Sequence, residues 1–96
     1  MRMSRRAGLI GGGGAAAYEI TVILCDEQGV YEEYSLGTYQ AGSTVNVDSD
    51  VMGWHPDYGT TGFYFYRALN SATQEVYATS TIFVMPNFNL TLEYTI

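Results

Sequence analysis

The final stretch FVMPNFNLTLEYTI, residues 83–96, decides the fold that we predict for this chain. From Leu90 to Ile96, apolar and polar residues alternate without interruption. A period of two is typical of a strand that buries one face. Residues 85–87 interrupt the preceding apolar run with a proline, which cannot donate to a sheet, and an asparagine, which suits a turn. We therefore expect the chain to close with a strand, a tight turn and a second strand that together complete a sheet.

Similar patterns divide the rest of the chain into short strands and turns. Residues 18–25 alternate and are apolar on both faces at their far end, which suits a central strand. Residues 30–39 alternate imperfectly and are expected at an edge. An irregular excursion or a short helix, begun by Ser49 or Asp50 as N-cap, is expected near 49–58. The expected strands cover residues 18–25, 30–39, 44–48, 62–69, 75–85 (one bent strand or two short ones) and 90–96.

These elements predict a mainly β protein. The 96 residues suffice for one domain with a modest core, and their hydrophobic content of 47% is normal. We predict a small single domain with an antiparallel or mixed sheet of six or seven strands and at most one short helix. No apolar run approaches the ~18 residues that a membrane-spanning helix needs, so no membrane partner is expected.

Charge is distributed very unevenly along the chain. Three of the four arginines (Arg2, Arg5 and Arg6) lie in the first six residues, there is no lysine, and all ten acidic residues follow position 18. Residues 1–17 thus have a side-chain charge of +3, and residues 18–96 have 1 − 10 = −9. A basic end on an acidic body suggests an arm that reaches a negative partner. The acidic body is a poor surface for nucleic acid.

Residues 1–17 have no periodic apolar pattern, and four consecutive glycines (11–14) form a flexible hinge. Three interpretations compete: a secretory or twin-arginine signal, a disordered tail, and an arm that binds a neighbouring subunit. A signal would need a longer apolar segment than Leu9 and Ile10 provide. We adopt the binding arm as the prediction, so residues 1–17 are the arm and residues 18–96 the domain. Its expected partner-binding residues are Arg2, Arg5, Arg6, Leu9 and Ile10.

Three sequence blocks follow one another in the order known from a bacterial repeat family. They are GTYQAGSTVNV (37–47), GFYFYRA (62–68) and FVMPNFNLTLEY (83–94). In this respect the chain resembles the Listeria–Bacteroides repeat, also called the internalin B-repeat. The resemblance implies a compact β-grasp-like module without catalytic residues, which offers a rigid spacer or an interaction surface. Tyr66-Arg67 departs from the family pattern, where Gly-Trp is expected.

The sequence gives little indication of a catalytic or metal-binding site. His55 is the only histidine, and nothing marks a nucleophile beside it. One histidine and one cysteine cannot supply the ligands of a zinc site. Asn46, Asp48, Asp50 and Asp57 fall near the spacing of a calcium loop, but its central glycine is missing. We therefore predict a protein that is not an enzyme and has no metal or other cofactor. The single cysteine, Cys25, is expected to be a buried structural thiol.

Aromatic residues offer a possible binding surface. Trp54, Tyr58, Tyr64 and Tyr66 could anchor a protein partner or, as an alternative, stack on carbohydrate. Along 62–69 the alternation places Phe63, Phe65, Arg67 and Leu69 on one face and Tyr64, Tyr66 and Ala68 on the other.

Two functional hypotheses remain. The first is a structural accessory protein whose arm attaches a rigid β module to the protein subunits of a larger assembly, such as the capsid or tail of a bacteriophage virion, with a homo-oligomer also possible. The second, which follows from the resemblance, is a secreted or cell-surface bacterial adhesion module that binds a ligand. Both would place the protein in a virion or outside the cell.

Overall fold

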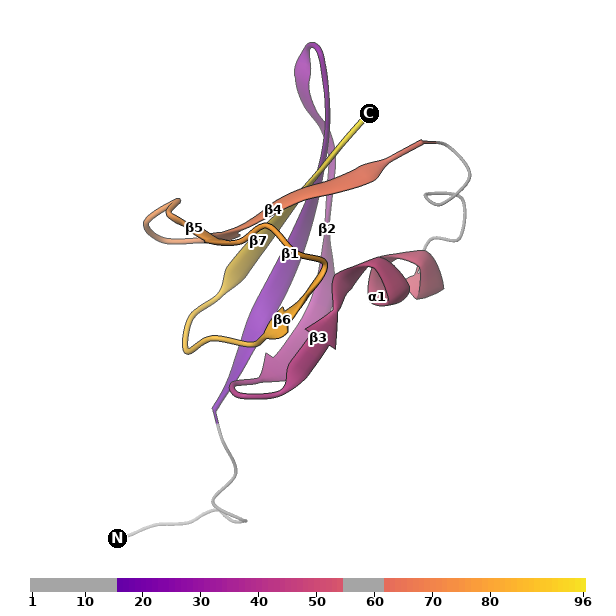
Figure 1. The fold of residues 1–96 in the computed structure, drawn as a ribbon. Helices are drawn as coiled ribbons and strands as arrows, with labels where there is room; N and C mark the ends of the chain where they lie inside the picture. The colour runs from indigo at the N-terminus through magenta and orange to yellow at the C-terminus, as the bar shows by residue number, and fades with distance from the viewer. Residues whose placement is uncertain (1–15, 55–61) are drawn as a thin grey trace, which may run out of the picture.

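The computed structural model of the chain describes residues 16–54 and 62–96, with the side chains of Tyr31 and Trp54 outside the description (Figure 1). The predicted arm lies outside the described residues except for Ala16 and Ala17. Seven strands and one helix follow in the described part of the chain. They are β1 (Ala17–Asp26), β2 (Gly29–Gln40), β3 (Thr44–Asn46), α1 (Val47–Trp54), β4 (Tyr64–Asn70), β5 (Val76–Ala78), β6 (Ile82–Val84) and β7 (Leu90–Thr95).

Five strands form one mixed sheet, in the order β2-β1-β7-β4-β5. β1 and β7 are parallel, and the other pairs in this sheet are antiparallel. β3 and β6 form a separate two-stranded antiparallel sheet. A hairpin, a helix on one side and a last strand parallel to the first give a β-grasp-like arrangement. The predicted fold class, a small mixed β domain of six or seven strands with one short helix, is confirmed.

β1 lies in the middle of the sheet, between β2 and β7, as its apolar residues on both faces predicted. Its register with β7 sets Ile20 beside Leu90 and Leu24 beside Tyr94. β2 lies at the edge, as its imperfect alternation indicated. The turn between β1 and β2 includes Gly29, whose φ of 116° is in the left-handed region that glycine adopts without strain.

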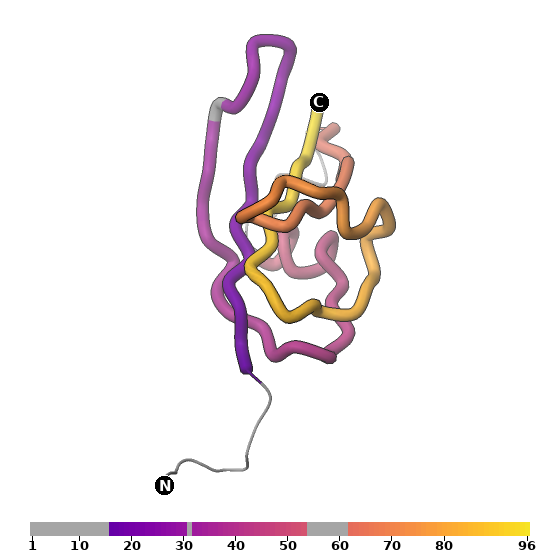
Figure 2. Tube along the Cα trace, turned by 90° about the vertical axis from the view of Figure 1, so that its left-hand side faces the viewer, coloured from indigo at the N-terminus to yellow at the C-terminus, as the bar shows by residue number. Residues whose placement is uncertain are grey.

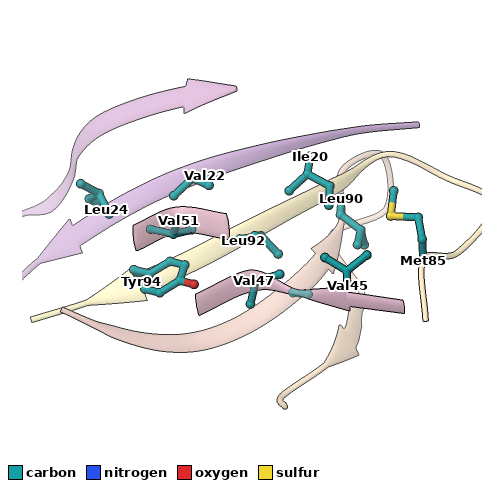
Figure 3. Close-up of a cluster of buried hydrophobic side chains, with 11 residues drawn as sticks. Ile20, Val22, Leu24, Val45, Val47, Val51, Met85, Leu90, Leu92 and Tyr94 are labelled. Carbon is teal, nitrogen blue, oxygen red and sulfur yellow. The ribbon is translucent and has the colours of Figure 1, made fainter. Parts of the chain in front are cut away.

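One face of the sheet packs against α1, β3 and the loop that follows β6, and this is where the core lies (Figure 3). Alternate residues of β1 and β7 supply its centre, because successive side chains of a strand point to opposite faces. Figure 3 shows the side chains of both strands directed toward those of α1 and β3. The buried core cluster consists of Ile20, Val22, Leu24, Val45, Val47, Val51, Ala68, Met85, Leu90, Leu92 and Tyr94.

The two closing strands do not complete the same sheet, contrary to the prediction. β6 pairs with β3 in the small sheet, and β7 joins the main sheet between β1 and β4. The link between them is held by Met85, which is buried and exchanges backbone hydrogen bonds with the turn at 42–43. These bonds attach the link to a turn elsewhere in the chain. The link therefore leads from the small sheet to the main sheet and does not close a hairpin.

The helix begins earlier than predicted. Val47 is its first residue, so the strand expected over 44–48 ends at Asn46. The side chain of Asn46, not that of Ser49 or Asp50, caps the helix by accepting a hydrogen bond from the Ser49 amide (3.1 Å). A short polar side chain directly before Val47 allows the backbone to leave the small sheet and enter a helix at once.

Two tyrosines of the sheet attach the first turn of α1. The Tyr94 hydroxyl donates a hydrogen bond to Asp48 Oδ1 (3.0 Å), and burial followed by this carboxylate raises the pKa of Tyr94. Burial, followed by the influence of Asp50, raises the pKa of Tyr39 to about 12. Both carboxylates lie where the helix dipole favours negative charge.

A bulge in β4 changes which residues share a face. Phe65 lies opposite Tyr94, but the next paired residue is Arg67, opposite Glu93. Tyr66 is therefore the extra residue of a bulge. Since Tyr94 faces the core and Glu93 faces away from it, the prediction that placed Phe65 and Arg67 on one face is wrong.

We predict that Leu92→Ala lowers the free energy of unfolding by about 2–5 kcal/mol, because Leu92 is completely buried at the centre of β7. Urea denaturation measures this change. Ile96→Ala is the control, since Ile96 is 68% exposed. It should change stability by less than about 0.5 kcal/mol. Equal effects of the two substitutions would contradict the assignment of the core face.

The raised pKa of Tyr39 predicts a loss of stability at high pH. The folded state favours the neutral phenol, so this contribution is complete below pH ~10, where an unfolded tyrosine titrates, and is lost as the pH rises toward 12. Tyr39→Phe should therefore lose less stability than the unaltered chain between pH 9 and 11. Urea denaturation at each pH tests this, with Tyr66→Phe as the control. An unchanged alkaline slope in Tyr39→Phe would contradict it.

Candidate interaction surface

The sheet has a second face, which we call the open face. It is the side opposite the core cluster. The other described elements that contribute to the core are α1, β3 and β6, and they all pack on the core side. The pairing of the strands arranges its residues in rows across the sheet. The rows are Val30–Cys25–Thr95–Tyr64, Glu33–Ile23–Glu93–Arg67 and Ser35–Thr21–Thr91–Leu69, with Val76 of β5 beside Leu69.

The middle row contains most of the charge at the centre of this face. The Arg67 guanidinium donates a hydrogen bond from Nε to Glu93 Oε1, and this bond raises the pKa of Arg67. Glu33 lies at the other end of the row, opposite Ile23. Strands lie about 4.8 Å apart, so the row is roughly 14 Å long. Arg67, the one cation among the described residues, is thus paired with an acid of the neighbouring strand.

Cys25 is half-buried on the open face and is not part of the core cluster. The expectation that this thiol is buried is therefore wrong, because the register of β1 directs Cys25 away from the core. Burial raises the pKa of the Cys25 thiol, the carboxylates of Glu93 and Asp26 raise it further, and Arg67 lowers it. These effects oppose formation of the thiolate, the reactive form of cysteine.

Two large aromatic side chains of β4 are strongly exposed. Tyr64 is 68% exposed and lies beside Thr95 at the end of the open face. Tyr66, the bulge residue, is 53% exposed, and the Arg67 guanidinium lies 4.9 Å from the centre of its ring. This is a cation–π geometry. The strand holds both residues in place through its pairing with β7.

The structure describes only part of the predicted site. Tyr64 and Tyr66 are together on one strand. Trp54 is the last residue of α1, and its side chain lies outside the description. Further predicted or considered residues fall outside the described part of the chain altogether: Arg2, Arg5, Arg6, Leu9, Ile10, His55, Asp57 and Tyr58.

The described residues contain no pocket and no group of three or more histidine, cysteine or acidic residues placed to hold a metal ion. Asn46, Asp48 and Asp50, considered as calcium ligands, instead make the contacts of the first helical turn. Among the described helices, none is long and apolar enough to cross a membrane.

Sequence reasoning missed the row that joins Glu33 to Arg67. The four residues of this row, Glu33, Ile23, Glu93 and Arg67, come from four different strands. They lie close together only because of the order of the strands in the sheet. One signal was available: in residues 90–96 the face opposite the leucines contains Thr91, Glu93 and Thr95. This pattern indicates a polar face but not what lies beside it.

Comparisons with protein-family models, with curated proteins and with solved structures find no match to this chain. The candidate site is therefore defined by its own geometry.

We predict that Glu93→Gln lowers the apparent pKa of Cys25. The substitution removes a neighbouring negative charge and frees Arg67, and both changes favour the thiolate. The rate of alkylation of the full chain by iodoacetamide, measured from pH 7 to 10.5, reports this pKa. Glu75→Gln is the matched control, since Glu75 lies in the turn before β5. A shift of equal size in both variants would contradict the placement of Cys25 beside Glu93.

Proposed function

We propose that this protein is a non-enzymatic structural accessory protein, a rigid β-grasp-like module that attaches to a larger protein assembly through residues 1–17. The observation that supports this most strongly is the exposure of Tyr64 and Tyr66 on a strand held within the sheet. A bacteriophage head or tail is the kind of assembly that we favour.

Exposed tyrosines on a rigid strand suit a protein interface. Aromatic residues and arginine are enriched among the residues that dominate binding energy. Tyr64, Tyr66 and Arg67 bring these types together, and the sheet restricts their motion before a partner arrives. Less conformational freedom is then lost on binding.

The shape of the module separates its two expected contacts. Figure 2 shows the start of the described chain at one end of the molecule and the β1–β2 hairpin at the other. Tyr64 lies beside Thr95, which lies beside Cys25 near the far end of β1. Cys25 lies eight positions after Ala17, which corresponds to about 27 Å along a strand. The arm and the exposed tyrosines can therefore bind different subunits.

A secreted or cell-surface binding module is the second candidate. It is supported by the resemblance of residues 37–47, 62–68 and 83–94 to a repeat family that is common on bacterial surfaces. This function predicts cleavage near Ala17, so an intact mass of the native protein that begins at Met1 would count against it.

We predict that deleting residues 1–17 abolishes attachment to the parent assembly, because these residues contain three of the four arginines. Co-sedimentation of the protein with the assembly measures attachment. The triple substitution Arg2→Gln, Arg5→Gln, Arg6→Gln leaves the length of the arm unchanged and should weaken attachment at least about tenfold. The attachment that remains should be lost in high salt. Undiminished attachment of the deleted chain would exclude the proposal.

Tyr64→Ala with Tyr66→Ala should also weaken co-sedimentation, by roughly tenfold or more if either residue is an anchor of the interface. Val84→Ala is the control, since Val84 is an exposed side chain of the small sheet. If the tyrosine variant binds as well as the control, the interface lies elsewhere.

A further inference from the structure

We propose that the open face of the sheet docks residues 1–10 of a second copy of this chain. The inference rests on the proposed function in one respect, since it takes residues 1–17 to be a binding arm. It adds the surface that receives the arm and the identity of one partner, the chain itself.

The open face is broad, and none of the described elements outside the main sheet packs on it. It extends over all five strands of the main sheet, and the helix and the small sheet lie on the opposite side. Its centre contains half-buried residues such as Ile23 and Thr91, and its margins contain Val30, Tyr64 and Val76, which are among the most exposed large apolar side chains. A second protein segment would bury these margins.

Charge selects a basic partner for this face. Glu19, Glu33 and Glu93 lie on it, and Arg67 is its one cation among the described residues. The sum is 1 − 3 = −2. Two open faces placed against each other would therefore repel. A segment with three arginines and no acid, such as residues 1–10, has the complementary charge.

The apolar residues of both partners can also meet. On the open face, the half-buried Ile23 lies in the charged row and the exposed Val76 lies at the margin, whereas Leu69 beside Val76 is already buried. Leu9 and Ile10 follow Arg6 by three and four residues, a distance of up to about 14 Å in an extended chain. Neighbouring rows of the sheet are two residues apart, about 7 Å. Arginines near Glu33 thus leave the two apolar residues within reach of Ile23, which lies opposite Glu33.

The arm leaves the sheet at Ala16 and is long enough to reach a second copy. Its carbonyl accepts a hydrogen bond from the Ala41 amide (2.9 Å), so β1 and β2 are still paired where the description begins. The preceding residues therefore join the sheet at its end. Fifteen residues span up to ~50 Å, similar to the 51 Å long axis of the described part. This length is sufficient to reach the open face of an adjacent molecule.

Crosslinking tests the contact directly, because the sole native cysteine, Cys25, lies on the open face. One full-length variant has Ser4→Cys together with Cys25→Ala, and it is mixed with the unaltered chain. A short bismaleimide should then join the two chains at low salt, and mass spectrometry should identify the link between positions 4 and 25. The yield should fall at least about fivefold in 1 M NaCl.

Variants of the open face provide the matched comparison. Glu19→Gln with Glu33→Gln in the unaltered partner should reduce the crosslink at least about fivefold, and both residues are exposed, so the fold should be retained. Glu27→Gln with Glu75→Gln removes the same charge from two turns and should leave the yield unchanged. Circular dichroism verifies the fold of each variant.

Three results would overturn the inference. They are the absence of a link to position 25, equal loss in both pairs of variants, and a link formed only within one molecule when Ser4→Cys is placed in a chain that retains Cys25. If attachment to the parent assembly still requires residues 1–17, the proposed function stands and only docking on a second copy is excluded.

Discussion

The parallel pairing of β1 with β7 is the contact on which the rest of the structure depends. It joins the first and last described strands and sets Ile20 and Leu24 beside Leu90 and Tyr94. A parallel pair needs a long connection between its strands, and here the connection contains every other described element after β1. The apolar side chains that this pair buries are the base on which α1, β3 and the Met85 link pack.

The same two strands each have a buried face and an open face. Successive residues point to opposite faces, so β7 directs Leu92 into the core and Glu93 to the open face. The core side is apolar and covered. The open side combines threonines, carboxylates and one arginine, which are compatible with water. A substitution on the open side can thus change its charge without altering the core.

Tyr94 connects the core to the only described helix. Its ring packs edge-on against Phe65 at 5.5 Å, and its hydroxyl reaches Asp48 in the first turn of α1. Together with Tyr39 and Asp50, this contact fixes a helix of eight residues, which is too short to be stable by itself in water. The tyrosine content of the chain therefore has two roles: some hydroxyls hold the helix, and the exposed rings of β4 remain available to a partner.

The sequence by itself determined the strands, because alternation of apolar and polar residues is a local property that the chain shows before it folds. It also predicted that β1 lies inside the sheet, that β2 lies at an edge and that there is at most one short helix. Only the tertiary structure decided that β6 and β7 enter different sheets, that Tyr66 is a bulge, and that Glu33, Ile23, Glu93 and Arg67 form one row. Strand order and register depend on packing between distant segments, and a one-residue shift exchanges the faces of every residue that follows.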